Sequence, residues 1–95
     1  MVTMNQAKTI VAAEPEEAAM RAELGSALEL WLSGARLTQT AAAALLGTTQ
    51  ARVSEIKHGK TAHFSLDLLV RLAARAGLEP RLLLTAPATP GETAR

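Results

Sequence analysis

The chain has 95 residues, 48% of them hydrophobic, and a formal net charge of +1. This length corresponds to one small domain. Because the chain has one Phe, one Trp and no Tyr, its core must consist mainly of Leu, Ala, Val and Ile. Such a core favours packed helices over stacked sheets. The absence of cysteine excludes disulfides, thiolate catalysis and cysteine-rich zinc sites, and it favours a cytoplasmic protein. Since there is no long apolar run and no signal-peptide pattern, we expect neither membrane insertion nor export.

The charge is unevenly distributed. Residues 14–35 carry five Glu against one Arg, whereas residues 36–63 carry four Lys and Arg against one Glu. A local positive excess attracts phosphates whatever the net charge of the chain, although a solvated face with scattered charge explains such asymmetry equally well when it stands alone.

The N-terminal residues 1–13 show no helical period. The β-branched run Thr9–Val11 predicts either a short edge strand or, equally, a disordered arm. Glu14 and Pro15 then open a helix that we expect to reach about Ser33 and to end at Gly34. Its apolar stripe should consist of Met20, Leu24, Ala27, Leu28 and Trp31, widened by Leu30 and Leu32. Trp31 is interpreted as a core anchor, because a single aromatic cannot build a stacking surface.

Residues 36–60 have the pattern of two short helices joined by a tight turn. Thr38 can cap the first helix and Gly47 can end it in the left-handed conformation. Thr49 and Gly59 repeat this arrangement for the second helix. The pattern predicts a helix-turn-helix that binds DNA.

The start of the second helix is where such a motif places side chains against base edges. The Gln50 amide suits adenine, Arg52 suits guanine or a phosphate, and Glu55 suits the amino group of cytosine. Ala51 can contact a thymine methyl group. Phosphate contacts are expected from Gln39, Lys57, His58 and Lys60. The alternative is a polar helix face with an Arg52–Glu55 pair.

His58 and His63 do not predict a metal site, because no third strong ligand lies close in the sequence. The Ser and Thr residues occupy capping positions without an activating base. We therefore expect no metal, no cofactor and no enzyme activity.

Ser65 caps a further helix, with Phe64 packing on Leu69. The buried stripe of that helix should be Leu66, Leu69, Val70 and Ala73, with Asp67, Arg71 and Arg75 facing outward. Gly77 should stop it, with Leu78 contacting Ala73.

The residues after this helix, Arg81–Thr85, are predicted to form a strand. A lone strand needs a partner, either Thr9–Val11 or its symmetry mate in a dimer. We favour a homodimer formed through Leu82, Leu83 and Leu84. Residues 87–95 have the composition of a flexible tail.

Several of these residues together resemble the Xre/Cro-type helix-turn-helix pattern over about residues 36–78. They are Leu37-Thr38-Gln39, Ala43, Leu46-Gly47, Gln50, Val53-Ser54, Ile56 and Gly59-Lys60. With the flanking helices, the whole resembles small antitoxins of the HigA type. The resemblance implies a mostly α, compact four- to five-helix, lambda-repressor-like domain over residues 14–86, with the C-terminal strand used in dimerisation.

The resemblance also implies functional residues. Base contacts fall on Gln50, Ala51, Arg52 and Glu55, and phosphate contacts on Gln39, Ser54, His58 and Lys60; Thr49 and Lys57 complete the phosphate set that we expect. The chain departs from the family at Lys57, where an acid is common, and at Ala42, where a larger apolar residue is common.

The implied function is a transcriptional repressor that binds a palindromic operator as a dimer and neutralises a RelE/HigB-like ribonuclease toxin. A basic toxin would be attracted to Glu14, Glu16, Glu17 and Glu23. The alternative is a free-standing phage-type or chromosomal repressor without a toxin. Either protein would act in the cytoplasm, associated with the nucleoid.

Overall fold

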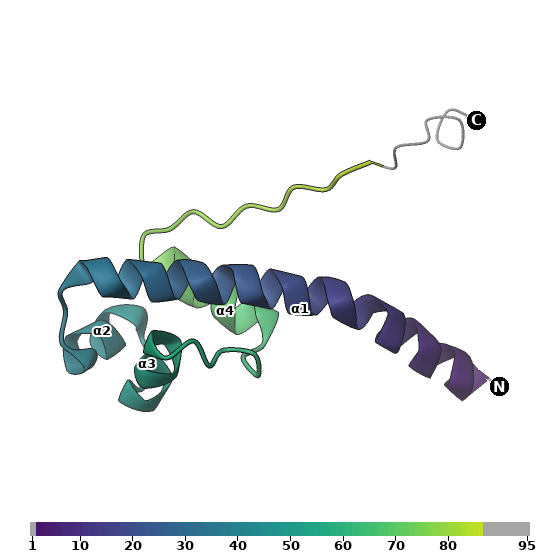
Figure 1. The fold of residues 1–95 in the computed structure, drawn as a ribbon, viewed down its shortest axis with the longest axis horizontal. Helices are drawn as coiled ribbons and strands as arrows, with labels where there is room; N and C mark the ends of the chain where they lie inside the picture. The colour runs from purple at the N-terminus through teal and green to yellow at the C-terminus, as the bar shows by residue number, and fades with distance from the viewer. Residues whose placement is uncertain (1, 87–95) are drawn as a thin grey trace.

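The structure is a computed structural model that describes residues 2–86, with side chains from Glu14 onward. It contains four helices, α1 (Val2–Ala35), α2 (Gln39–Leu46), α3 (Gln50–Lys57) and α4 (Leu66–Arg75). Figure 1 shows α2 and α3 beneath one end of the long helix α1, with α4 packed along it. The fold is therefore mostly helical, as predicted. No helix in the described part is long and apolar enough to cross a membrane.

Helix α1 begins at Val2 rather than at Glu14. Within residues 2–13 the backbone is helical, so the edge strand predicted at Thr9–Val11 is not present there. Gln, Ala and Lys around that short β-branched run favour the helix. Pro15 lies inside the helix and leaves the carbonyl of residue 11 without its usual N–H donor, and such a proline kinks a helix. Figure 1 shows the N-terminal part of α1 bending away from the rest.

The other end of α1 also differs from the prediction. The helix continues past Gly34 to Ala35, and the chain reverses at Arg36, which adopts the left-handed conformation (φ 57°). The predicted stripe is correct at Leu28, which is completely buried, but wrong at Leu30, which is 76% exposed. At 100° per residue, Leu30 lies about 200° around the helix from Leu28. Ala27 is exposed as well.

The core lies between α1, the α2–α3 pair and α4. Trp31 packs against this core from α1, which confirms its role as an anchor. The buried alanines of α2 are small enough for its neighbours to approach closely. The core residues are Leu28, Ala42, Ala43, Leu46, Val53, Ile56, Phe64, Leu69 and Leu72.

Helix α4 follows the predicted capping pattern. The Ser65 hydroxyl accepts a hydrogen bond from Leu68 N at 3.3 Å, and Phe64 is buried beside the helix start. After Gly77 (φ 90°), Leu78 N donates to the carbonyl of Ala73 at 3.0 Å, so the predicted stop is confirmed. The predicted stripe needs one correction. Leu72 is buried, whereas Val70 is 42% exposed.

The chain after α4, residues 78–86, has no regular secondary structure, so the predicted strand Arg81–Thr85 is not present in the described part of this single chain. In Figure 1 this segment stands away from α1. Leu82, Leu83 and Leu84 are 72%, 90% and 77% exposed. The predicted flexible tail, 87–95, lies outside the described residues.

Candidate nucleic-acid interface

The turn between α2 and α3 consists of Gly47, Thr48 and Thr49, and each of its ends is held by a cap. Gly47 is the C-cap of α2, and the Thr49 hydroxyl caps α3 by accepting from Arg52 N at 3.1 Å; at the start of α2, the Thr38 hydroxyl accepts from Ala41 N at 3.0 Å. Gly47 adopts φ 67° and ψ 39°, which lets Thr48 N donate to the carbonyl of Ala43 at 2.9 Å. These contacts confirm the predicted caps and close the sharp turn of the motif.

Arg75 of α4 stabilises the same turn. Its Nη1 atom donates to the carbonyl of Leu46 at 3.0 Å, so it satisfies one of the free carbonyls at the end of α2. A Cβ atom on Gly47 would lie 2.7 Å from this Nη1 atom. Gly47 is therefore required by its left-handed backbone conformation, and a Cβ atom there would also displace the Arg75 guanidinium. Arg75 was predicted to face outward, and its contact with Leu46 could not be predicted because it depends on how α4 packs against α2.

The orientation of α3 follows from its two buried residues. Val53 and Ile56 are 0% and 1% exposed, and they fix the inner face of the helix against the core. Gln50, Ala51 and Arg52 in the first turn are consequently exposed. The structure thus brings three of the four predicted base-reading residues together on one accessible helix start.

The fourth, Glu55, has a partner within the chain. Its Oε2 atom lies 3.3 Å from His63 Nε2, and the Glu55 side chain is 38% exposed. The His63 ring meets the buried Phe64 ring edge-on, with 5.0 Å between centroids. Sequence reasoning missed this pair, since the loop after α3 brings His63 back to the helix. One carboxylate oxygen of Glu55 is engaged, and the other has no partner among the described residues.

The predicted phosphate contacts differ in accessibility. Lys57, His58 and Lys60 are exposed at the end of α3, whereas Gln39 and Ser54 are half-buried. Thr49 is exposed, with its hydroxyl engaged as a cap. His58 Nδ1 lies 2.8 Å from the Ser54 carbonyl; because a carbonyl only accepts, Nδ1 carries the proton. His58 is thus oriented by the helix end that it caps.

Sequence comparison identifies this arrangement. Residues 8–82 match the family described as a helix-turn-helix domain. The chain belongs to this helix-turn-helix domain family. The match spans most of the chain, and proteins with this domain are DNA-binding regulators. No curated protein matches the chain. Among solved structures, none matches it either.

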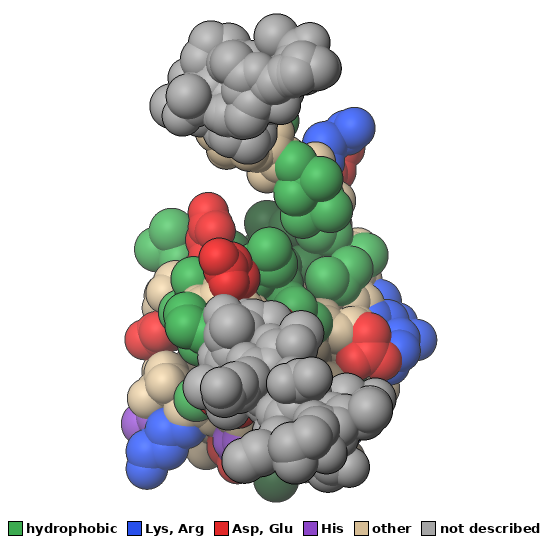
Figure 2. Space-filling view, turned by 90° about the vertical axis from the view of Figure 1, so that its right-hand side faces the viewer, with side chains coloured by type: hydrophobic (Ala, Val, Ile, Leu, Met, Phe, Trp, Pro, Cys, Tyr) green, Lys and Arg blue, Asp and Glu red, His purple; other side chains and the backbone are tan. Residues whose placement is uncertain are grey.

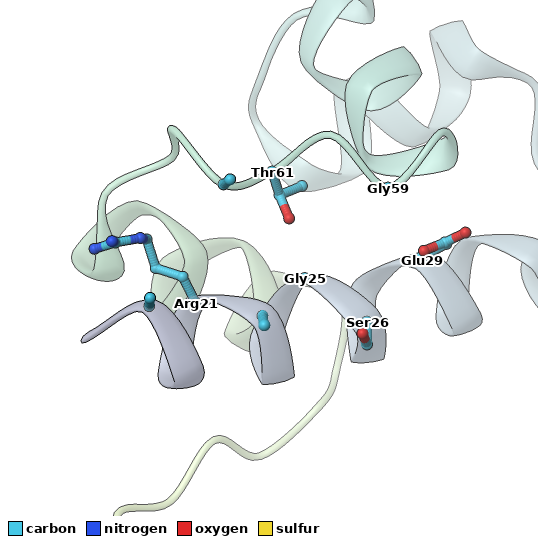
Figure 3. Close-up of a pocket in the computed structure, with 9 residues that line it drawn as sticks. Arg21, Gly25, Ser26, Glu29, Gly59 and Thr61 are labelled. Atoms are coloured by element: carbon cyan, nitrogen blue, oxygen red, sulfur yellow. The ribbon is translucent and has the colours of Figure 1, made fainter. Parts of the chain in front are cut away.

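Gly25 of α1 allows the loop after α3 to pack closely against that helix. Thr61 in this loop is 6% exposed and points toward Gly25 of α1 (Figure 3), where any Cβ atom would collide with the Thr61 hydroxyl. Beside this contact lies an open hollow of about 220 Å³, which Arg21 and Glu29 flank. Gly25 thereby positions the loop that carries Lys60 and His63 beside α3. The sequence offered no indication of this role, because a glycine inside a helix reads only as a weak helix former.

The described side chains hold no group of three or more possible metal ligands. His63 is instead engaged with Glu55, and the ring of His58 is held at the end of α3.

Proposed function

We propose that this helix-turn-helix protein is a sequence-specific transcriptional repressor that binds a palindromic operator as a homodimer. The observation that carries the proposal is the exposed first turn of α3, which presents Gln50, Ala51 and Arg52 while Val53 and Ile56 anchor the helix from behind. Such a helix start enters the major groove of DNA, where the four base pairs present distinct patterns.

Each reading residue has a base that matches its chemistry. The Gln50 amide donates and accepts together, as adenine N6/N7 requires, and Arg52 donates to guanine O6/N7. Glu55, with one oxygen engaged by His63, keeps the other to accept from cytosine N4. Ala51 contacts a thymine methyl group.

The phosphate contacts surround this reading surface. Lys57, His58 and Lys60 lie exposed after α3, and Gln39 lies at the start of α2, where free backbone N–H groups attract anions. Thr49 and Ser54 complete the set. These groups position the domain on the duplex without reading its sequence. We propose a binding protein rather than an enzyme.

Selection from a library of random DNA duplexes tests this proposal. We expect enrichment of a palindrome whose half-sites lie one helical turn, about 34–36 Å, apart. Fluorescence anisotropy should then show that the selected duplex binds at least about 10³-fold more tightly than a scrambled one at the same salt concentration. Equal affinity for both duplexes would contradict sequence-specific binding.

We further propose that the repressor serves as the antitoxin of a RelE/HigB-like ribonuclease toxin. The support is an acidic, exposed region of α1 formed by Glu14, Glu16, Glu17 and Glu23. A ribonuclease with a basic surface would be attracted to it. The side chains lie on a different helix from the reading residues, so toxin and DNA can bind at once.

Co-expression tests the antitoxin role. The chain should restore growth of cells that express the toxin encoded beside it, and replacing Glu14, Glu16 and Glu17 by glutamine should weaken capture of that toxin while operator binding is retained. Arg52→Ala is the matched control, since it should weaken operator binding and leave toxin capture unchanged. A neighbouring gene that causes no growth arrest would instead favour a free-standing repressor.

A further inference from the structure

An apolar groove runs between α1, α4 and the C-terminal segment. Met20, Leu24 and Ala27 of α1 and Leu66 and Val70 of α4 line one side, and residues 80–83 line the other. Its volume is about 590 Å³. Figure 2 shows hydrophobic side chains gathered over this part of the surface, below the segment. The segment does not fill the groove that it borders.

Within residues 2–86, neither the leucines nor the backbone of the segment has a partner. Leu82, Leu83 and Leu84 are each more than 70% exposed, which is unusual for three consecutive large apolar residues. In an extended chain, Leu83 points to the side opposite Leu82 and Leu84, so one face of the segment stays in water even if the other turns to the groove. None of the backbone hydrogen bonds found within residues 2–86 involves Arg81–Thr85. The segment therefore offers apolar side chains that can be buried and backbone groups that can pair with another strand.

We infer that the groove is covered by the C-terminal segment of a second copy of this chain, which pairs antiparallel with the segment of the first. This inference rests on the homodimer of the proposed function and names the surface that receives the partner. A second copy supplies apolar side chains for the groove and a strand edge for the backbone, and the two-fold arrangement satisfies both copies at once.

Charge complementarity supports the same occupant. Glu23 of α1 lines the groove beside its apolar residues, and Arg81 lies on the segment. Among the described residues, Arg81 forms an ion pair with Glu79 at 3.4 Å, and because both side chains are about 80% exposed, this pair contributes little. In the dimer that we infer, Arg81 of the second copy faces Glu23 of the first. The dimer thus contains two such pairs, one in each groove.

The position of the groove is compatible with DNA binding. In Figure 1 the segment leaves on the side of α1 opposite α2 and α3. Pairing at the groove therefore leaves the first turn of α3 accessible in both copies.

Charge reversal distinguishes a contact between copies from a contact within one. Sedimentation equilibrium without DNA should show a dimer for the wild type, with the dissociation constant raised about tenfold or more in Glu23→Arg and in Arg81→Glu. Mixing the two variants should restore wild-type affinity, because each groove then holds one Arg and one Glu. A contact within a single chain would not be restored by mixing, and that result would overturn the inference.

A matched pair of alanines on α1 tests the apolar part of the groove. Ala27 and Ala22 are both exposed, but only Ala27 lines the groove. Ala27→Glu should raise the dimer dissociation constant by at least tenfold, whereas Ala22→Glu should leave it within about twofold. Equal effects of the two changes, or a wild type that stays monomeric, would overturn the inference. The experiment contains no DNA, so it tests the dimer contact even if the protein does not bind an operator. Arg52→Ala, which alters a proposed DNA contact, should dimerise with the affinity of the wild type.

Discussion

Glu55 Oε2 and His63 Nε2 lie 3.3 Å apart, so the loop after α3 holds a side chain of α3 in place. Only one of the two carboxylate oxygens is engaged in this pair. His63 is accordingly interpreted as a positioning residue for Glu55.

This relationship predicts that two residues affect the same operator position. Glu55→Ala should reduce discrimination at one base pair by about 1–3 kcal/mol, because the carboxylate that accepts from cytosine is lost. His63→Ala should reduce discrimination at the same base pair by a smaller amount, since Glu55 remains but is less well oriented. Anisotropy with operators changed one base pair at a time measures both effects. Uniform weakening across all base pairs would contradict the assignment of Glu55 as a reader.

Two glycines should respond in opposite directions to replacement by alanine. Gly47→Ala should destabilise the fold by at least about 1–2 kcal/mol, because an L-residue is strained at φ 67° and its Cβ atom would displace Arg75. Gly34→Ala should stabilise it by about 0.5–1 kcal/mol, because Gly34 is helical and nothing lies within 4 Å of an added Cβ atom. Urea unfolding measures both. A neutral Gly47→Ala would argue against the described turn.

Two leucines of α1 differ sharply in burial, so replacing each by alanine should change the free energy of unfolding by different amounts. Leu28→Ala should lower the free energy of unfolding by about 2–5 kcal/mol, because the side chain is completely buried. Leu30→Ala should change it by less than about 0.5 kcal/mol, since Leu30 is 76% exposed. Similar costs, measured by thermal unfolding at a fixed protein concentration, would contradict the described face of α1.

Asp67 at the start of α4 predicts a pH effect. A hydrogen bond from the Ser65 side chain holds the pKa of Asp67 below its usual value of 3.8, although desolvation of the carboxylate acts in the opposite direction. A carboxyl whose folded pKa is lowered contributes stability above its unfolded pKa and loses it as the pH falls through the folded value. The difference in unfolding free energy between wild type and Asp67→Asn should therefore be constant from about pH 7 to 5 and shrink below about pH 4. A difference that persists at about pH 2 would exclude this origin.

Local features of this fold could be predicted from the sequence. The caps Thr38, Thr49 and Ser65 and the left-handed Gly47 and Gly77 depend on neighbours within a few residues, and all were predicted correctly. The buried and exposed positions of α3 follow from the helical period for the same reason. Most of the candidate site was therefore visible in the sequence.

Contacts between distant segments could not be predicted. The bond from Arg75 to the Leu46 carbonyl, the Glu55–His63 pair and the packing of Thr61 on Gly25 join residues from different elements. The start of α1 was missed for another reason, since Pro15 and a β-branched run suggest a boundary that good helix formers on both sides override. Strand pairing at Arg81–Thr85 needs a second chain, so one chain alone does not test it.

The central claim is that α3 reads the operator, and comparison of Arg52→Ala with Lys60→Ala tests it most directly. Both side chains are exposed and basic, so they are matched in charge. On the selected operator, Arg52→Ala should cost about 1–3 kcal/mol and relax the preference at one base pair, whereas Lys60→Ala should weaken all sequences alike and reduce the salt slope by about one. Unchanged operator binding in both variants, or the same loss on every sequence from Arg52→Ala, would contradict this account.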